Sequence, residues 1–119
     1  MREIKFRAYD AVLGMCPVVE IDFANRILLV QGKDGGLYSL SIENSPLLEY
    51  TGLKDKNGRE IYEGGIIKWG EGAEGEVRWI GLNAAFNVMM FSGGWLLFVP
   101  PVCEVIGNIY DNPELVKEG

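Results

Sequence analysis

Residues 70–75 read Gly-Glu-Gly-Ala-Glu-Gly, which has the Gly-x-Gly-x-x-Gly spacing of a dinucleotide-binding loop. Such a loop holds a pyrophosphate only where a helix begins directly after the last glycine, because the helix N-terminus supplies the N–H groups that bind it. Residues 76–80 have a strand-like pattern instead. The carboxylates of Glu71, Glu74 and Glu76 would also repel a phosphate at short range. We therefore interpret residues 70–75 as an acidic turn between two strands.

Other catalytic or metal-binding patterns are equally weak. The three glutamates of this segment lack the spacing of oxygen ligands in a calcium or magnesium loop, so we expect no metal site. The chain has no histidine, which excludes Ser-His-Asp and Cys-His catalysis. Asp111 and Glu114 surround a helix-start pattern, where negative charge has a structural use. We expect no enzymatic activity, no catalytic residue and no cofactor.

A basic block lies between two tyrosines in the middle of the chain. Cationic side chains beside exposed aromatic rings can bind a phosphate backbone and stack on bases, and the same block could contact a partner protein. Asp55 and Glu60 dilute its charge, and the chain carries a net charge of −6, which weighs against a broad nucleic-acid surface. The candidate binding residues, all expected to be exposed, are Tyr50, Lys54, Lys56, Asn57, Arg59 and Tyr62.

Residues 95–102 form an apolar run that does not alternate with polar residues. A strand with one solvated face should alternate, so the run indicates that both faces are covered. The cover is either a second subunit or the rest of a single small barrel, and both interpretations stay open. The candidate interface residues are Trp95, Leu96, Leu97, Phe98 and Val99.

The elements that would position these residues are short strands separated by glycine-rich turns. Residues 4–8 and 18–23 alternate apolar and charged side chains, and Asp34-Gly35 predicts a hairpin between residues 26–31 and 36–42. Further strands are predicted over residues 66–69, 77–80, 86–91, 95–99 and 104–110. Asn112-Pro113 has the pattern of a helix N-cap followed by proline at the first helical position.

These elements predict an all-β chain in which N-terminal strands pack with a small glycine-rich C-terminal β-barrel, followed by one short C-terminal helix. Pro46 interrupts the strand pattern, so we place one sub-domain over residues 1–45 and the other over residues 46–119. The longest apolar run is too short to cross a membrane, and the N-terminus has no apolar signal segment, so we expect a cytoplasmic protein without a membrane partner. Cys16 and Cys103 are expected to be buried thiols.

Three blocks carry a resemblance to a known family. They read REIKFRAYD over residues 2–10, EYTGLKDKNGREIYEG over residues 49–64, and EVIGNIYDNPEL over residues 104–115. Together and in this order they resemble the YopX family of phage and prophage proteins. The resemblance implies an all-β fold, a phage or prophage origin and self-association, and it implies no established activity. Where the family usually has aspartate, this chain has Gly65, and the consequence of that difference is open.

The function expected from these observations is a non-enzymatic module that assembles with itself, as a homo-oligomer, or binds a phage or host protein. The alternative is a nucleic-acid-binding regulator that uses the basic block. The alternative predicts binding that weakens steeply with added salt and that Lys54→Glu together with Lys56→Glu abolishes.

Overall fold

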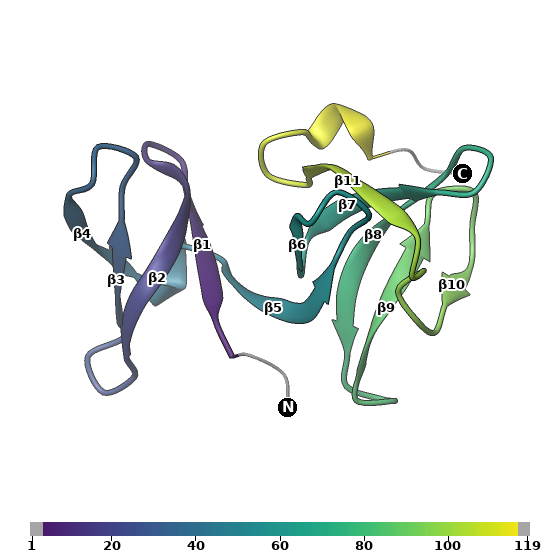
Figure 1. Ribbon diagram of the computed structural model, residues 1–119. Helices are drawn as coiled ribbons and strands as arrows, with labels where there is room; N and C mark the ends of the chain where they lie inside the picture. The colour runs from purple at the N-terminus through teal and green to yellow at the C-terminus, as the bar shows by residue number, and fades with distance from the viewer. Residues whose placement is uncertain (1–3, 117–119) are drawn as a thin grey trace. The chain divides into compact units, whose positions relative to one another are not determined.

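The computed structural model describes residues 4–116, which form strands and turns with almost no helix, so the all-β prediction is confirmed. These residues divide into two compact units, residues 4–49 and residues 50–116. Figure 1 draws the strands of the first unit in purple and blue, and those of the second in teal to yellow.

The first unit is an antiparallel sheet with the strand order β4-β3-β2-β1-β5. A short 3-10 turn, Ile42–Asn44, precedes the last of these strands in the chain. The bounds are β1 (Phe6–Asp10), β2 (Gly14–Asp22), β3 (Ile27–Gln31), β4 (Leu37–Ser41) and, continuing into the second unit, β5 (Leu47–Lys54). The predicted early strands and the hairpin are present.

The turn of the β3–β4 hairpin follows from its sequence. Gly35 has a φ of +85°, a conformation that side chains rarely adopt. The carboxylate of Asp34 accepts a hydrogen bond from the Gly36 N–H at 2.9 Å and another from the Tyr38 hydroxyl at 2.5 Å. The Asp-Gly pair therefore sets the turn, and the turn sets the β3–β4 register.

One face of this sheet forms the core of the first unit. Leu28 and Val30 of β3 are fully buried, and Ala8 and Cys16 join them from β1 and β2. Leu29 lies between the two buried residues of β3 and points to the opposite face, as strand alternation requires. The unit thus has one apolar face and one that meets solvent.

The second unit contains a separate antiparallel sheet with the strand order β10-β9-β8-β7-β11. A short strand, β6, pairs with β5 in the same unit. The bounds are β6 (Glu60–Tyr62), β7 (Gly65–Trp69), β8 (Ala73–Ile80), β9 (Ala85–Met90), β10 (Trp95–Leu96) and β11 (Cys103–Asn108).

The predicted C-terminal barrel does not form. Within residues 50–116 the sheet begins at β10 and ends at β11, and these two edge strands are not paired, so the sheet stays open. Strand β10 has two residues rather than the predicted five. Pro100 and Pro101, which lack the N–H that a ladder needs, follow soon afterwards. The apolar run therefore leaves the sheet before it can close it.

The predicted C-terminal helix is reduced to one 3-10 turn, Pro113–Leu115. Asn112 does not cap it. Its side-chain oxygen accepts a hydrogen bond from the Asn108 N–H at 3.1 Å, which ties the segment back to the end of β11. None of the helical segments in residues 4–116 is long and apolar enough to cross a membrane.

The turn formed by the Gly-x-Gly-x-x-Gly segment is shorter than the six residues that the sequence predicted. Strand β8 begins at Ala73, so only the first three of its six residues connect two strands. Gly75 lies inside β8 opposite Met90, and a strand rather than a helix follows it. The structure therefore lacks the helix N-terminus that a dinucleotide site needs.

The core of the second unit is formed by the inward faces of β7, β8 and β9. Ile67, Val77 and Val88 are fully buried, and Ile61 of β6 and Cys103 of β11 join them. Both cysteines of the chain are free thiols and buried, as the sequence predicted.

We expect both thiols to resist alkylation in the folded chain. Burial raises the pKa of Cys16 and of Cys103, and the carboxylates of Asp10 and Asp55 respectively raise them further. At pH 7.5 neither sulfur then holds much of the reactive thiolate. Mass spectrometry after iodoacetamide treatment should show no adduct on the native chain and two adducts in denaturant. Rapid native labelling of either cysteine would contradict this.

Candidate interaction site

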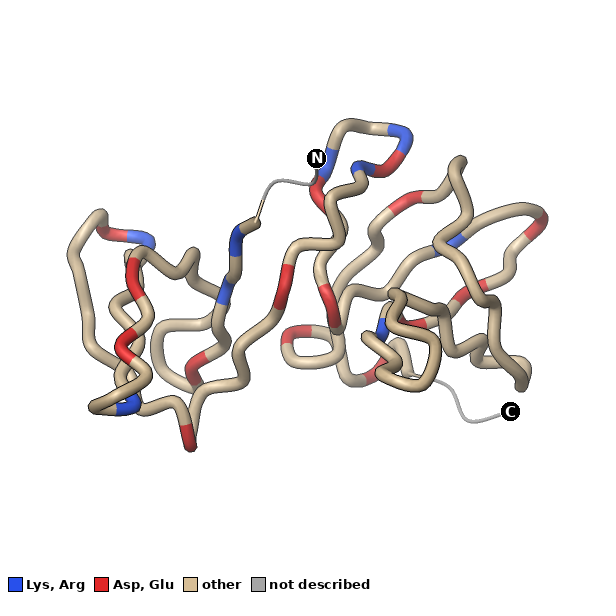
Figure 2. The backbone as a smooth tube through the Cα atoms, turned by 90° about the horizontal axis from the view of Figure 1, so that it is seen from below, with Lys and Arg blue, Asp and Glu red and all other residues tan. Residues whose placement is uncertain are grey.

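The β5–β6 connection presents the basic residues of the predicted block to solvent. Lys54, Lys56 and Arg59 are exposed, as is Asn57 at the tip. Figure 2 shows basic positions gathered on this loop, with acidic positions interleaved. The exposure expected for these four residues is therefore present.

Asp55 holds this loop in place and is itself buried, with 6% of its surface exposed. One carboxylate oxygen accepts hydrogen bonds from the N–H groups of Asn57 and Arg59, at 2.9 and 2.8 Å. The other accepts one from the Val105 N–H of β11 at 2.9 Å. The loop is thus fixed both to itself and to the sheet edge.

The ionisation of Asp55 reflects these contacts. Burial alone would raise the pKa of the carboxyl group. The three backbone N–H groups outweigh burial, with Val105 first among them, so the pKa of Asp55 lies below its usual value. The folded structure therefore stabilises the charged carboxylate form of Asp55.

Tyr50 and Tyr62 do not belong to the exposed block, which corrects the prediction. They face each other across β5 and β6, with ring centroids 5.3 Å apart, and are 3% and 8% exposed. The Tyr62 hydroxyl donates to Glu60 at 3.1 Å. Rings buried in this way cannot stack on nucleic-acid bases, so the block is basic without being aromatic.

Beside the loop is a cavity of about 210 Å³ that brings two lysines to one place. Lys56 lines it from the loop and Lys68 from β7, together with Trp69 and Glu104. Glu104 and Glu74 are the residues directly opposite Lys68 on its two neighbouring strands, so they share its face of the sheet. The charges of these two glutamates balance those of the two lysines, so the cavity does not favour an anion.

The run 95–99 is divided between the core and solvent. Val99 is buried and Leu96 packs against the same core. Trp95, Leu97 and Phe98 are exposed by 43%, 68% and 57%. One side of the run is therefore open in the chain by itself, so the rest of the chain does not cover both faces, and cover by a second subunit stays a prediction.

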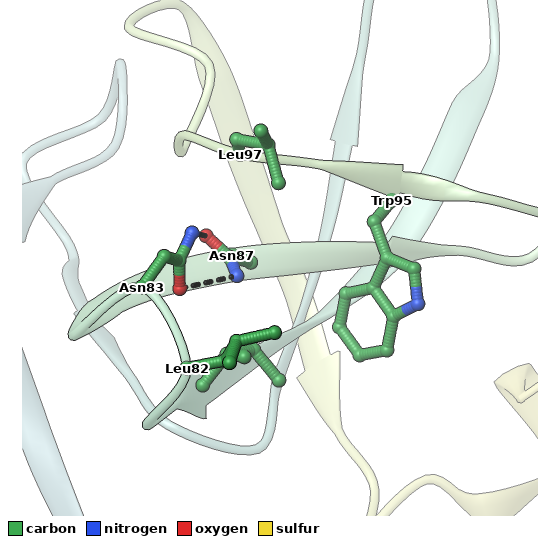
Figure 3. A pocket seen from close by; sticks show the side chains of 6 residues that line it. Leu82, Asn83, Asn87, Trp95 and Leu97 are labelled. Carbon is green, nitrogen blue, oxygen red and sulfur yellow. Dashed lines mark hydrogen bonds between the residues drawn. The ribbon is translucent and has the colours of Figure 1, made fainter.

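The open side borders an apolar pocket of about 480 Å³ (Figure 3). Trp95 and Leu97 line it from one side, and Leu82, which is 99% exposed, lines it from the β8–β9 turn. Asn83 and Asn87 complete it, their side-chain amides exchanging two hydrogen bonds of 3.2 Å. We call this surface, with Ile80, the Trp95 face.

An ion pair supports the indole of this face. The guanidinium of Arg78 donates two hydrogen bonds of 3.0 Å to the carboxylate of the buried Glu76. Its central carbon lies 5.9 Å from the centre of the Trp95 ring, within cation–π range. The hydrogen bonds to Glu76 hold this cation beside the indole ring.

Sequence reasoning missed the contribution of the β8–β9 turn to this surface. Leu82 stands among Gly81, Asn83 and Ala84, where a turn normally carries polar side chains. The sequence feature that could have indicated this surface is a leucine placed within a turn.

Gly65, the position at which the sequence resemblance implied an aspartate, is the first residue of β7 and is buried. A Cβ atom at this position would lie 3.0 Å from the Tyr62 carbonyl oxygen, which is tighter than ordinary contacts. The glycine therefore lets the β6–β7 turn close more tightly than a side chain there would.

The comparisons with known proteins agree with this fold. No curated protein matches the chain. The crystal structure of protein EF1440 from Enterococcus faecalis is similar, with a TM-score of 0.66 and 25% sequence identity, over 98% of this chain and 100% of that one. The family model described as YopX protein matches residues 5–117, nearly the whole length. The chain therefore belongs to the YopX family.

Proposed function

We propose that the chain is a phage- or prophage-encoded, non-enzymatic module of the cytoplasm that assembles with itself through the Trp95 face. Its membership of the YopX family supports the phage or prophage origin. Two buried free thiols fit a reducing compartment. Among residues 4–116 the buried carboxylates are those of Asp55 and Glu76, and both are engaged in structural hydrogen bonds, which supports a role without catalysis.

The exposed apolar surface around Trp95 is the single observation that carries this proposal. Leu82, Trp95 and Leu97 lie together around one pocket, and each exposes a large part of its side chain to water. Contiguous apolar surface of this kind, rimmed by polar groups, marks a place where another molecule binds.

A second copy of the chain is the occupant that the shape favours. The surface has both a projecting side chain, Leu82, and a hollow of about 480 Å³ beside it. In a twofold contact the same patch meets itself, so the leucine of each copy can enter the hollow of the other. The polar amides of Asn83 and Asn87 would then lie at the border of a buried apolar contact.

Light scattering coupled to size-exclusion chromatography tests the proposal. We expect the native chain to exceed the monomer mass of 13.2 kDa at micromolar concentration. Leu97→Lys and Leu82→Lys should each weaken assembly at least tenfold, because burying an unpaired ammonium group is costly. Val12→Lys is the matched control, since Val12 is 91% exposed and belongs to the other unit.

Two results would overturn self-assembly through this face. One is a native chain that stays at the monomer mass across the micromolar range. The other is an oligomer that Val12→Lys dissociates while both leucine variants leave it intact.

A further inference from the structure

Strand β4, at the edge of the first unit, lacks the devices that usually prevent strand addition. Its sequence, Leu-Tyr-Ser-Leu-Ser, has no charge and no proline, and four of its five residues are exposed. It pairs with β3 on one side and ends the strand order on the other. Natural edge strands are normally protected by lysine, proline or a bulge.

The hairpin geometry shows which backbone groups face the open side. The Gly32 N–H donates to the Gly36 carbonyl at 2.8 Å, and the Ile42 N–H donates to the Arg26 carbonyl at 3.1 Å. Hydrogen-bonded pairs alternate along an antiparallel ladder. The intervening residues of β4 therefore direct their N–H and C=O groups away from β3, and these residues are Leu37, Ser39 and Ser41.

The side chains of those residues lie on the solvent face of the sheet. Ser39 is opposite Leu29, which is opposite Glu20. Residues that face each other across a ladder share a face. A shallow pocket of about 160 Å³ lies there, lined by Glu20, Asp22, Ile27, Leu29 and Ser39.

This face is acidic with an apolar floor. Asp22 is bound by the side chain and N–H of Asn25, and these hydrogen bonds lower the pKa of its carboxyl group, so it is negative at neutral pH. Glu20 is exposed. No Lys or Arg lines the pocket, and the floor between the carboxylates and β4 is formed by Ile27 and Leu29.

We propose that β4 binds an extended basic peptide segment of a partner protein, which adds to the sheet as an antiparallel strand. The partner residues opposite Leu37, Ser39 and Ser41 would lie on the acidic face. The small serines leave room for their long side chains to cross the apolar floor.

The distances suit arginine or lysine at every second position of such a segment. An added strand would lie three strand spacings, about 14 Å, from β2. An extended arginine reaching inward and Glu20 reaching outward together cover most of that span. The aliphatic stem would rest on Ile27 and Leu29, and the charged head would meet Glu20 or Asp22.

A second copy of this chain does not supply the required charges. Its own β4 has no basic residue, so pairing two β4 strands would leave both acidic faces without partners. The charge complementarity therefore favours a basic partner over self-pairing at this edge.

Fluorescence anisotropy with labelled ten-residue peptides tests this directly. The probe alternates valine and arginine, and a second peptide has glutamate in place of arginine. We expect at least tenfold weaker binding of the glutamate peptide. Methylating the arginine backbone amides, which would face β4, should also weaken binding at least tenfold, whereas methylating the valine amides should leave it unchanged.

Protein variants examine the same contact from the other side. Ser39→Pro removes an N–H that faces the open edge and should weaken binding at least tenfold, while Ser39→Thr keeps it. Glu20→Gln should weaken binding about threefold, as expected for an exposed charge. Thermal melting checks that each variant folds, and the methylated peptides test pairing without altering the protein.

Three results would overturn the proposal. The first is equal binding of the two methylated peptides, which would indicate charge attraction without strand pairing. The second is equal binding of the arginine and glutamate peptides. The third is an absence of peptide binding together with an oligomer that Ser39→Pro dissociates, which would assign the edge to a second copy.

Discussion

Replacing Asp55 with alanine is expected to destabilise the unit formed by residues 50–116 by about 3 kcal/mol. The carboxylate accepts hydrogen bonds from three backbone N–H groups while almost wholly buried. Removing it leaves these donors without their acceptor and breaks the side-chain hydrogen bond that joins the β5–β6 loop to the Val105 N–H of β11.

Urea denaturation followed by tryptophan fluorescence measures this loss, because all three tryptophans belong to that unit. Glu71→Ala is the matched control, since it removes an exposed carboxylate from another turn of the same unit. The control should change the free energy of unfolding by less than about 0.5 kcal/mol. Equal effects of the two substitutions would show that the hydrogen bonds of Asp55 contribute nothing specific.

The same residue predicts a dependence on pH. Because the folded pKa of Asp55 lies below its unfolded value of about 3.9, its contribution is fully present above that value. The contribution is lost as the pH falls through the folded pKa. Stability of the native chain should therefore decline below about pH 4, and the decline should be smaller in Asp55→Ala. An identical pH profile for both proteins would contradict this.

The local parts of the fold could be predicted because their causes are local. Asp34-Gly35 sets a turn within a few residues, and alternation in β1 identifies Ala8 as a buried residue. The GxGxxG segment could be rejected as a nucleotide site for the same reason, since the residues after Gly75 have a strand pattern. Each of these inferences needed only neighbouring residues.

What failed depended on pairing between distant segments. Closing the barrel would require β10 to pair with β11. These strands lie at opposite edges of the sheet, and no local sequence pattern indicates this. Tyr50 and Tyr62 were expected at the surface because a charged turn separates them, yet the β5–β6 register turns both rings inward. The sequence also could not show that run 95–99 divides between core and solvent, since every residue in it is apolar.

The GxGxxG segment nevertheless contains a glycine that the fold requires, and Gly75→Ala should destabilise the same unit by about 2 kcal/mol. A Cβ atom on Gly75 would lie 2.6 Å from both the Met89 carbonyl oxygen and a methyl group of Val88. The oxygen belongs to the backbone of β9, so relief requires the two strands to separate. The last glycine of the pattern is therefore needed for close approach of β8 and β9, where a nucleotide-binding loop would need it for helix packing.

Gly81→Ala provides the comparison, because a Cβ atom there would meet nothing within 4 Å. Gly81 belongs to the same unit and follows the same strand, so both variants add one methyl group to one region of the sheet. Urea denaturation should show the loss for position 75 and a change within about 0.5 kcal/mol for position 81. Equal stability of Gly75→Ala and Gly81→Ala would contradict this prediction. It would show that strands β8 and β9 accommodate the methyl group without a cost in free energy.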